Sequence, residues 1–354
     1  MKKIVLTGGG TAGHVTPNFA LLEGLAEAGY EIHYIGSRNG IEKELVRQQH
    51  LPYHPISSGK LRRYKDLKNL TDPFKVLLGC VQAWKVLGRI RPAVVFSKGG
   101  FVAVPVVLGA WLRRIPVVVH ESDMTPGLAN RLSQPFAKAV CTTFPQTLEH
   151  LPKTKGVHTG SPIRKSLYQG DAGRGREFTG LTARRPVLLM MGGSIGSVKV
   201  NQVLRALLPT LLEEFHVLHL CGKGNLDDKL EGTPGYRQYE FIGKELPDLL
   251  AMADLVLSRA GSNAISEFLA LKKPALLVPL SAGASRGDQI LNARAFQRDG
   301  YAHLLQEEEL TQETLLEAIR QLWTDRDACI RAMEGAPHTD GTEKVLETIK
   351  EYSR

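Results

Sequence analysis

Short apolar runs rich in β-branched residues alternate with helical patterns along most of the chain. This alternation predicts parallel βαβ units and therefore an α/β fold. In the first half we expect strands at residues 4–6, 32–35, 93–96, 117–119 and 139–142. In the second half we expect them at 186–191, 216–220, 239–242, 255–257, 275–278 and 301–305.

The alternation breaks between residues 151 and 180, where prolines, glycines and polar residues replace the apolar runs. It resumes with the strand at 186–191. A chain of 354 residues with 43% apolar content can bury two cores of ordinary domain size. We therefore expect two domains, at residues 1–162 and 163–337.

Each half has a glycine-rich loop directly after its first strand. The first loop reads Thr-Gly-Gly-Gly-Thr-Ala-Gly-His at 7–14, and the second reads Met-Gly-Gly-Ser-Ile-Gly-Ser at 191–197. A strand, a glycine turn and a helix together place backbone N–H groups and a helix N-terminus against phosphate. We therefore predict two doubly wound, Rossmann-like parallel-sheet domains that face each other across a cleft.

The first loop also matches the G-x-G-x-x-G pattern of dinucleotide-binding folds through Gly8, Gly10 and Gly13. Those folds use an acidic residue about 20 positions on, at the end of the second strand, to bind the ribose. Here the strand ends read Ile-Gly-Ser at 35–37 and Leu-Cys-Gly at 220–222, without a carboxylate. NAD is therefore disfavoured, and the absence of G-x-x-x-x-G-K-[ST] disfavours a P-loop nucleotide site.

Positive charge is concentrated in the first half. Residues 1–162 hold 21 Lys or Arg and 10 Asp or Glu, a net charge of +11, whereas the whole chain carries +9. Such a domain suits a polyanion: nucleic acid, an anionic membrane or a phosphorylated substrate. The alternative is a basic surface that serves only solubility.

The excess lies mainly in residues 60–91, where apolar residues recur at helical spacing between the cations. An apolar stripe usually belongs to a core, but flanking cations also suit an anionic membrane surface, which we favour. No nucleic-acid motif accompanies the charge, so nucleic acid is disfavoured. The candidate membrane residues are Arg62, Arg63, Lys65, Phe74, Leu77, Leu78, Trp84 and Trp111.

Other site classes find little support. The four cysteines are scattered and read as reduced thiols, not as disulfides or zinc ligands. No group of residues has metal-ligand spacing, so we expect neither a metal nor a cofactor. No apolar run reaches the roughly 18 residues that a membrane-spanning helix needs.

Three residues of the first half are candidates for acid–base chemistry. His14 lies near the start of a helix expected at 15–28, whose dipole favours the neutral imidazole; the alternative is a capping or packing histidine. Glu121 and Asp123 follow the strand at 117–119, at a carboxyl strand end where α/β sites lie. Spacing alone leaves the base open among these three residues.

In the second half, small residues around Ser262 and Asn263 would let a phosphate or ribose reach a helix N-terminus. Glu267, one turn further, suits two ribose hydroxyls or supports the helix cap. Gln289 suits a sugar or caps its own helix. Arg164 suits a pyrophosphate at the hinge or is a surface arginine.

Six motifs occur together in a specific order. They are Gly9–His14, Gly99-Gly100-Phe101, His120-Glu121, Ser161-Pro162-Ile163-Arg164, Gly192–Gly196, and Arg259-Ala260-Gly261 with Ser266-Glu267. With these motifs the chain closely resembles the MurG family of peptidoglycan N-acetylglucosaminyltransferases over essentially its full length. The resemblance implies a GT-B fold in which a C-terminal helix at about 338–354 joins the first domain.

The resemblance further implies an inverting transfer of GlcNAc from UDP-GlcNAc, as a substrate, to the C4 hydroxyl of MurNAc in lipid I, which forms lipid II. It places the acceptor and membrane functions in the first domain and UDP-GlcNAc binding in the second. It also implies a peripheral protein on the cytoplasmic side of the cell membrane. Its implied partners are cell-wall synthesis and division proteins. The alternatives are a related GT-B enzyme for another UDP-sugar, such as a glycolipid synthase or a UDP-GlcNAc epimerase, and a non-enzymatic basic membrane-binding adaptor.

By the same resemblance, His14 is the catalytic candidate and Ile242 contacts uracil through its backbone. Three positions depart from the family pattern. Ala12 replaces a common glycine, Asp123 replaces a common asparagine and so loses an amide donor, and Asp288 replaces one of two glutamines, which leaves Gln289. The implied donor-site positions are Thr11, Ala12, Gly13, Asp123, Arg164, Ser194, Ile242, Ser262, Asn263, Glu267 and Gln289.

Overall fold

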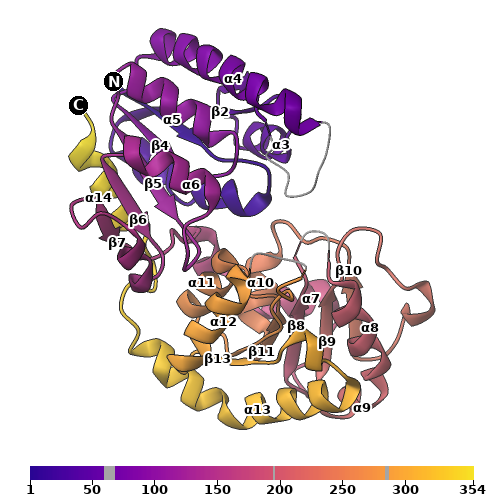
Figure 1. Cartoon of the computed structure of the whole chain (residues 1–354). Helices are drawn as coiled ribbons and strands as arrows, with labels where there is room; N and C mark the ends of the chain where they lie inside the picture. Colours follow the sequence, from indigo (N-terminus) through magenta and orange to yellow (C-terminus); the bar gives the residue numbers. More distant parts are fainter. Residues whose placement is uncertain (60–67, 194–195, 284–286) are drawn as a thin grey trace. The chain divides into compact units, whose positions relative to one another are not determined.

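The computed structural model of the chain describes residues 1–59, 68–193, 196–283 and 287–354, with the backbone alone for 68–71. The chain divides into two compact units (Figure 1). The first unit comprises Met1–Arg164 together with Asp340–Arg354, and the second comprises Lys165–Thr339. Each unit is built on its own parallel sheet, as the alternating pattern predicts.

The sheet of the first unit has seven parallel strands in the order β3-β2-β1-β4-β5-β6-β7. Its order reverses between β1 and β4, which is the doubly wound arrangement. The strands are β1 (Lys2–Thr7), β2 (Tyr30–Ser37), β3 (Tyr53–Ile56), β4 (Val94–Ser97), β5 (Val117–Glu121), β6 (Ala139–Thr142) and β7 (Gly156–His158).

Helices cover both faces of this sheet. Ile4 and Leu6 of β1 pack on one face with Val345 of the C-terminal helix, whereas Val5 packs on the other face with Leu87. Because both faces are covered, the inner strands β1, β4, β5 and β6 are apolar at their central positions. The helices are α1 (Thr16–Phe19), α2 (Leu22–Glu27), α3 (Ile41–Gln48), α4 (Lys68–Ile90), α5 (Ala103–Leu112), α6 (Leu128–Ser133) and α14 (Thr342–Tyr352), with 3-10 turns η1 (Ala12–His14), η2 (Gln134–Phe136) and η3 (Pro145–His150).

The second unit repeats this plan with six parallel strands in the order β10-β9-β8-β11-β12-β13. The strands are β8 (Val187–Met191), β9 (His216–Leu220), β10 (Tyr236–Tyr239), β11 (Leu255–Ser258), β12 (Ala275–Leu277) and β13 (Ala302–Leu304). The helices are α7 (Ala172–Thr179), α8 (Val198–Ala206), α9 (Leu208–Glu214), α10 (Leu246–Met252), α11 (Ser262–Ala270), α12 (Asp288–Arg298) and α13 (Gln312–Glu334), with 3-10 turns η4 (Lys165–Gln169), η5 (Asp228–Leu230) and η6 (Glu307–Glu309).

Four local expectations were wrong. The helix expected at 15–28 is split into α1 and α2, and β10 lies three residues earlier than predicted. Strands β3 and β7 were missed because they are only four and three residues long and include proline, glycine and histidine, so they lack the apolar run of a central strand. Both lie at the edges of the sheet.

The sheet order decides where a ligand site can lie. In each unit the glycine-rich loop follows the strand at the point where the order reverses, β1 in the first unit and β8 in the second. Ligands of doubly wound sheets bind outside the carboxyl strand ends at this point. The two predicted loops therefore occupy the binding position of their own sheets.

Candidate functional site

A buried carboxylate holds the first glycine-rich loop. Glu42 is wholly buried, and its Oε2 accepts a hydrogen bond from Gly10 N at 3.2 Å. Its Oε1 accepts from Ser37 N at 2.9 Å and from Ser37 Oγ at 2.5 Å. The loop is thus tied to the carboxyl end of β2 through a residue that comes from α3.

Glu42 corrects one expectation. We predicted no carboxylate at the end of the second strand, yet Glu42 reaches that position from five residues downstream of Ser37. It accepts hydrogen bonds through both oxygens and is inaccessible to solvent, so it is not offered to a ribose. The carboxylate at this strand end therefore supports the loop.

The loops after β1 and β4 approach each other too closely for side chains. A Cβ on Gly100 would lie 2.1 Å from the carbonyl oxygen of Gly9, and the φ angle of Gly100 is +82°. Lys98 N donates to Thr7 O at 2.9 Å. Glycine is required here because the two backbones touch at the reversal of strand order.

His14 is fixed by a backbone carbonyl and not by a helix dipole. It ends the 3-10 turn η1, and the helix that follows, α1, has only four residues. The His14 Nδ1 donates to Lys98 O at 3.1 Å. Since a carbonyl only accepts, the neutral ring carries its lone pair on Nε2, the nitrogen suited to act as a base.

Glu121 holds the turn after β5. Its carboxylate accepts from Asp123 N at 3.0 Å, Gly127 N at 3.0 Å and Asn130 Nδ2 at 2.8 Å. Burial and the neighbouring Asp123 carboxylate raise the pKa of Glu121. Glu121 is almost fully buried whereas Asp123 is partly exposed, so these contacts suit Glu121 to positioning the turn that carries Asp123.

The remaining predicted residues of the first unit lie in the loop after β1 and at the end of the unit's first stretch. Thr11 is exposed, and Ala12 and Gly13 begin η1 with partial exposure. Arg164 is the last residue of the first stretch of this unit. Its neighbour Ile163 donates its N–H to Thr342 Oγ1 at 3.0 Å, which ties this segment to the start of α14.

In the second unit, the loop after β8 is as tightly packed as the first. Gly196 has a φ of +79°, and a Cβ there would lie 2.0 Å from Cys221 O. The same carbonyl accepts from Asn201 Nδ2 at 2.8 Å, and His219 Nε2 lies 2.9 Å from Asn201 Oδ1. A buried polar network thus supports this loop; predicted residue Ser194 lies outside the described part of the chain.

The other donor-site candidates follow three strands of the second sheet, β10, β11 and β12. Ser262 is the first residue of α11, after β11, with Asn263 next and Glu267 one turn further. Gln289, in the first turn of α12, accepts from Leu280 N at 3.0 Å and so braces the loop after β12. Ile242 follows β10 and is nearly buried. The segments after β10, β11 and β12 therefore all lie at the carboxyl edge of one sheet.

Sequence reasoning missed the role of Arg259 in this loop system. Its guanidinium forms a mostly buried ion pair with Glu307 and donates to Val278 O at 3.0 Å. Glu307 also accepts from Ser281 N at 3.1 Å. The Arg259 cation and these hydrogen bonds lower the pKa of Glu307 against the effect of burial. The pair joins the β11 and β12 loops, and its partners lie too far apart in sequence for a motif to reveal.

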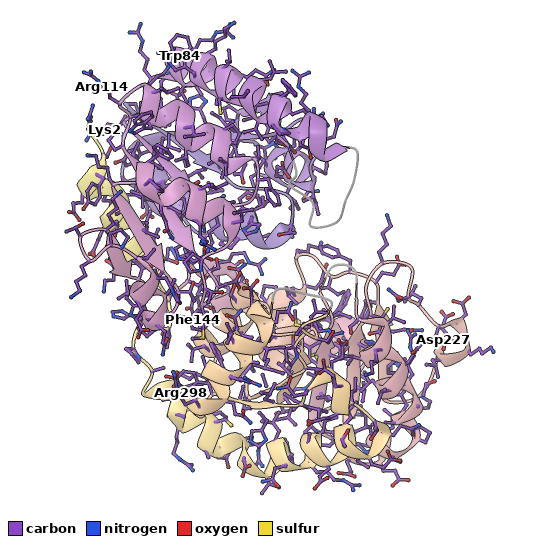
Figure 2. The ribbon with its side chains drawn as sticks, in the orientation of Figure 1. Lys2, Trp84, Arg114, Phe144, Asp227 and Arg298 are labelled. Carbon is purple, nitrogen blue, oxygen red and sulfur yellow. The ribbon has the colours of Figure 1, made fainter. Side chains whose placement is uncertain are left out.

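The apolar stripe of α4 is exposed and does not belong to the core. Phe74 is 73% exposed and Leu77 is 64% exposed, whereas Ala83 and Leu87 of the same helix are wholly buried. Arg113 stacks over Trp84, 4.0 Å from the ring centroid, and Figure 2 shows Trp84 and Arg114 at the surface of the first unit. The α4–α5 patch consists of Phe74, Leu77, Leu78, Val81, Trp84, Trp111 and Leu112.

The described cations around the α4–α5 patch belong to α4 and to the turn after α5. Lys85, Arg89 and Arg114 are exposed there. The predicted membrane residues Arg62, Arg63 and Lys65 lie outside the described residues. Among the described helices, none is long and apolar enough to cross a membrane. The described residues also contain no group of three or more His, Cys, Asp or Glu side chains that could hold a metal ion.

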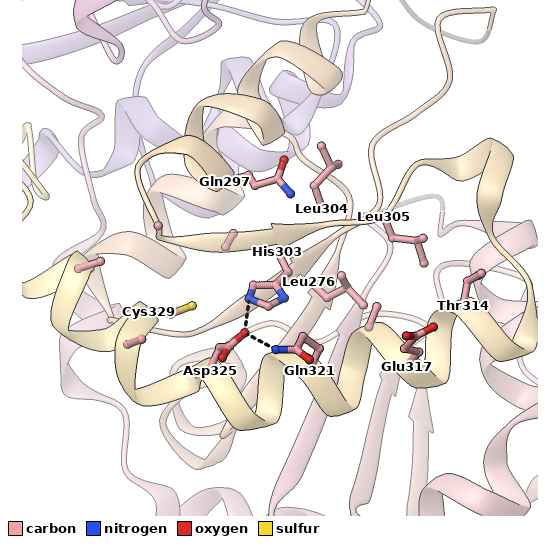
Figure 3. A pocket seen from close by; sticks show the side chains of 15 residues that line it. Leu276, Gln297, His303, Leu304, Leu305, Thr314, Glu317, Gln321, Asp325 and Cys329 are labelled. Atoms are coloured by element: carbon pink, nitrogen blue, oxygen red, sulfur yellow. Dashed lines mark hydrogen bonds and ion pairs between the residues drawn. The ribbon is translucent and has the colours of Figure 1, made fainter.

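A pocket of about 670 Å³ lies elsewhere in the second unit, between β13 and α13 (Figure 3). His303 and Gln321 both contact Asp325 in it, at 3.3 and 2.8 Å. None of the predicted site residues lines this pocket. We therefore place the candidate site at the carboxyl strand ends and not here.

Two family models match the chain, one in each half. Residues 4–142 match the model of the glycosyltransferase family 28 N-terminal domain, and residues 187–349 match that of the family 28 C-terminal domain.

Two curated proteins are similar to the whole chain. One, from Lachnoclostridium phytofermentans, is 59% identical over 351 residues, covering 99% of each chain. The other, from Lachnospira eligens, is 56% identical over 354 residues and 100% of each chain. Both are named UDP-N-acetylglucosamine–N-acetylmuramyl-(pentapeptide) pyrophosphoryl-undecaprenol N-acetylglucosamine transferase. Among solved structures, MurG of Acinetobacter baumannii matches with a TM-score of 0.78 and 25% identity, covering 99% of this chain and 100% of that one.

Proposed function

The chain belongs to glycosyltransferase family 28, and we propose that it transfers GlcNAc from UDP-GlcNAc to the C4 hydroxyl of MurNAc in lipid I, forming lipid II with inversion. The observation that carries this proposal is the 59% identity, over 99% of both chains, to a relative named for this transfer. The product is a peptidoglycan precursor, so the enzyme serves cell-wall synthesis.

The donor binds mainly to the second unit. Ser262 and Asn263 open α11, whose N-terminal N–H groups suit a diphosphate. We assign Glu267, one turn further along α11, to the ribose hydroxyls, and the backbone at Ile242, after β10, to uracil. Gln289 braces the neighbouring loop, with the sugar as its second partner. Thr11, Ala12, Gly13 and Arg164 of the first unit, and Ser194, complete the proposed donor contacts.

The acceptor and its base belong to the first unit. The Lys98 carbonyl orients His14 so that Nε2 is the basic nitrogen. Asp123 is the second candidate for the base, because Glu121, the third, is held by three donors. We assign the deprotonation of the acceptor hydroxyl to His14. Asp123 is then a contact of the sugar donor, and Glu121 positions the turn that carries Asp123.

The reaction is a single displacement. The base removes the proton of the acceptor hydroxyl while the hydroxyl oxygen attacks the anomeric carbon of GlcNAc. The attack comes from the face opposite UDP, so the configuration at this carbon is inverted. Backbone donors and helix N-termini stabilise the charge that develops on the leaving UDP. No metal ligand set takes part in these steps, so the rate in EDTA should equal the rate in Mg²⁺.

The α4–α5 patch brings the enzyme to its lipid substrate. Exposed apolar side chains beside the cations of α4 and the turn after α5 suit a peripheral contact with an anionic membrane, on the cytoplasmic side. Each cation near such a surface contributes about 1 kcal/mol. Arg62, Arg63 and Lys65 are proposed to add to this attraction.

A transfer assay tests the proposal. Radiolabel from UDP-GlcNAc should enter the lipid fraction only when lipid I is present, and label from UDP-GalNAc should not. Conversion of UDP-GlcNAc without lipid I would instead indicate an epimerase. Absence of UDP binding by calorimetry at millimolar concentration would leave only a non-enzymatic adaptor.

A further inference from the structure

Lys98 is a buried lysine at the centre of the first unit's candidate site. It directly follows β4, the strand between β1 and β5, and its side chain is 1% exposed. Its backbone joins two loops, because its N–H donates to Thr7 and its carbonyl accepts from His14 Nδ1. A lysine is almost never fully buried unless its amine has partners.

The amine of Lys98 has two partners, one near the end of β5 and one in the turn after it. Nζ lies 2.7 Å from His120 Nδ1 and 2.5 Å from Ser122 Oγ. The other ring nitrogen of His120, Nε2, lies 3.0 Å from the carbonyl oxygen of Gly160. Since the carbonyl only accepts, Nε2 carries the proton and Nδ1 accepts from Lys98. Lys98 therefore holds His120 neutral, in one tautomer.

The surroundings of Lys98 are mostly acidic. Glu121 at the end of β5, Asp123 in the turn after it and Cys141 of β6 all act on the pKa of Lys98. Lys344 of α14 acts in turn on the pKa of Cys141. Burial lowers the pKa of Lys98 to about 7, although these acidic groups act in the opposite direction. Burial and the Lys98 cation in turn hold the pKa of His120 well below its usual range.

We propose that Lys98 is a positioning residue for the transfer reaction, which fixes His14 through its carbonyl and the turn from His120 to Asp123 through its amine. A single residue thereby sets the geometry of both candidates for the base, and its charge acts on Asp123. The proposal rests on the proposed function, because His14 and Asp123 are assigned there.

Replacing the amine separates geometry from charge. Lys98→Met keeps an unbranched side chain but removes the donors and the charge, and should lower kcat about tenfold to hundredfold through misplacement of the turn. The KM for UDP-GlcNAc should stay within about twofold. Loss of a neighbouring cation raises the pKa of a base, whether the base is an imidazole or a carboxylate. The acid limb of the pH profile of kcat/KM should therefore move to higher pH.

Lys98→Gln restores a donor without the charge. It should recover part of the lost kcat and keep the shifted acid limb, a combination that a purely structural role does not produce. Lys273→Met is the matched control, because the Lys273 amine likewise has two hydrogen-bond partners, the backbone carbonyls of Ala251 and Ala253 at 3.2 and 2.9 Å, and a pKa lowered by burial. It should leave the acid limb unchanged.

Ser122→Ala removes one partner of the Lys98 amine and needs no change to Lys98, so it tests the proposal even if the Lys98 variants do not fold. It should lower kcat several-fold with an unchanged donor KM. Wild-type kcat in Ser122→Ala, or an unshifted acid limb in both Lys98 variants, would overturn the proposal. Failure of the proposed function itself is seen separately, as absence of transfer by the wild-type enzyme.

Discussion

Gly10 N donates to the buried carboxylate of Glu42 at 3.2 Å, so one acidic side chain restrains the loop that carries His14. Three donors, one from this loop and two from Ser37 at the end of β2, converge on this carboxylate. In a phosphate-binding loop such an N–H group would point to the ligand. Here the Gly10 N–H donates to a side chain of the protein itself, so this loop supports His14 more than it binds phosphate.

We therefore expect Glu42→Ala to destabilise the first unit by about 1–3 kcal/mol, the usual cost of leaving buried donors unsatisfied. The variant should also lose kcat, since the loop carries His14. Urea unfolding and steady-state kinetics measure the two effects. Glu44→Gln, at an exposed acid of the same helix, is the control and should change neither.

His14→Ala should reduce kcat by about 10²–10⁴-fold, the usual contribution of a general base. The KM for UDP-GlcNAc should change little, because the donor contacts lie mainly in the second unit. Steady-state kinetics with lipid I provide the measurement, with the exposed His150→Ala as a control. An unchanged kcat would exclude His14 and transfer the role to Asp123.

The double variant Leu77→Ser/Leu78→Ser should weaken binding to anionic liposomes by at least about tenfold, since each leucine buried in the membrane contributes about 1.5–3 kcal/mol. The two side chains are 64% and 51% exposed. Val198→Ser/Leu226→Ser is a matched control, at 61% and 49% exposure in the second unit. Liposome sedimentation compares the two; equal losses would mean that the α4–α5 patch is not the membrane contact.

Acid should destabilise the second unit through His219. Burial, with a contribution from the Arg205 cation, lowers the pKa of His219 from 6.5 to about 3. Between these values the unfolded chain binds a proton that the folded one does not, so stability falls as the pH falls, by about 1.4 kcal/mol per unit.

Urea unfolding from pH 4 to 7 measures this loss. The gap in unfolding free energy between wild type and His219→Gln should narrow as the pH falls, because the glutamine does not titrate. His150→Gln, at an exposed histidine, should run parallel to wild type. A constant gap between wild type and His219→Gln would show that His219 is protonated in the folded state.

The sequence by itself determined the fold class and the family. Strands covered by helices on both faces must be apolar throughout, so central strands such as β1 and β5 are visible as short runs. Glycines that tolerate no Cβ, such as Gly100, mark the loops where backbones touch. Edge strands β3 and β7 carry no such signal, because one side of each is open and its residues are only partly buried.

Only the tertiary structure decided which groups meet. Glu42 reaches the first loop across 32 positions, and Lys98 reaches His120 and Ser122 across the neighbouring strand β5. Helical spacing showed that α4 has an apolar stripe, but not that Phe74 and Leu77 face outward while Leu87 faces the sheet. Periodicity describes one element at a time, whereas burial and hydrogen bonding depend on what packs against it, which local sequence does not contain.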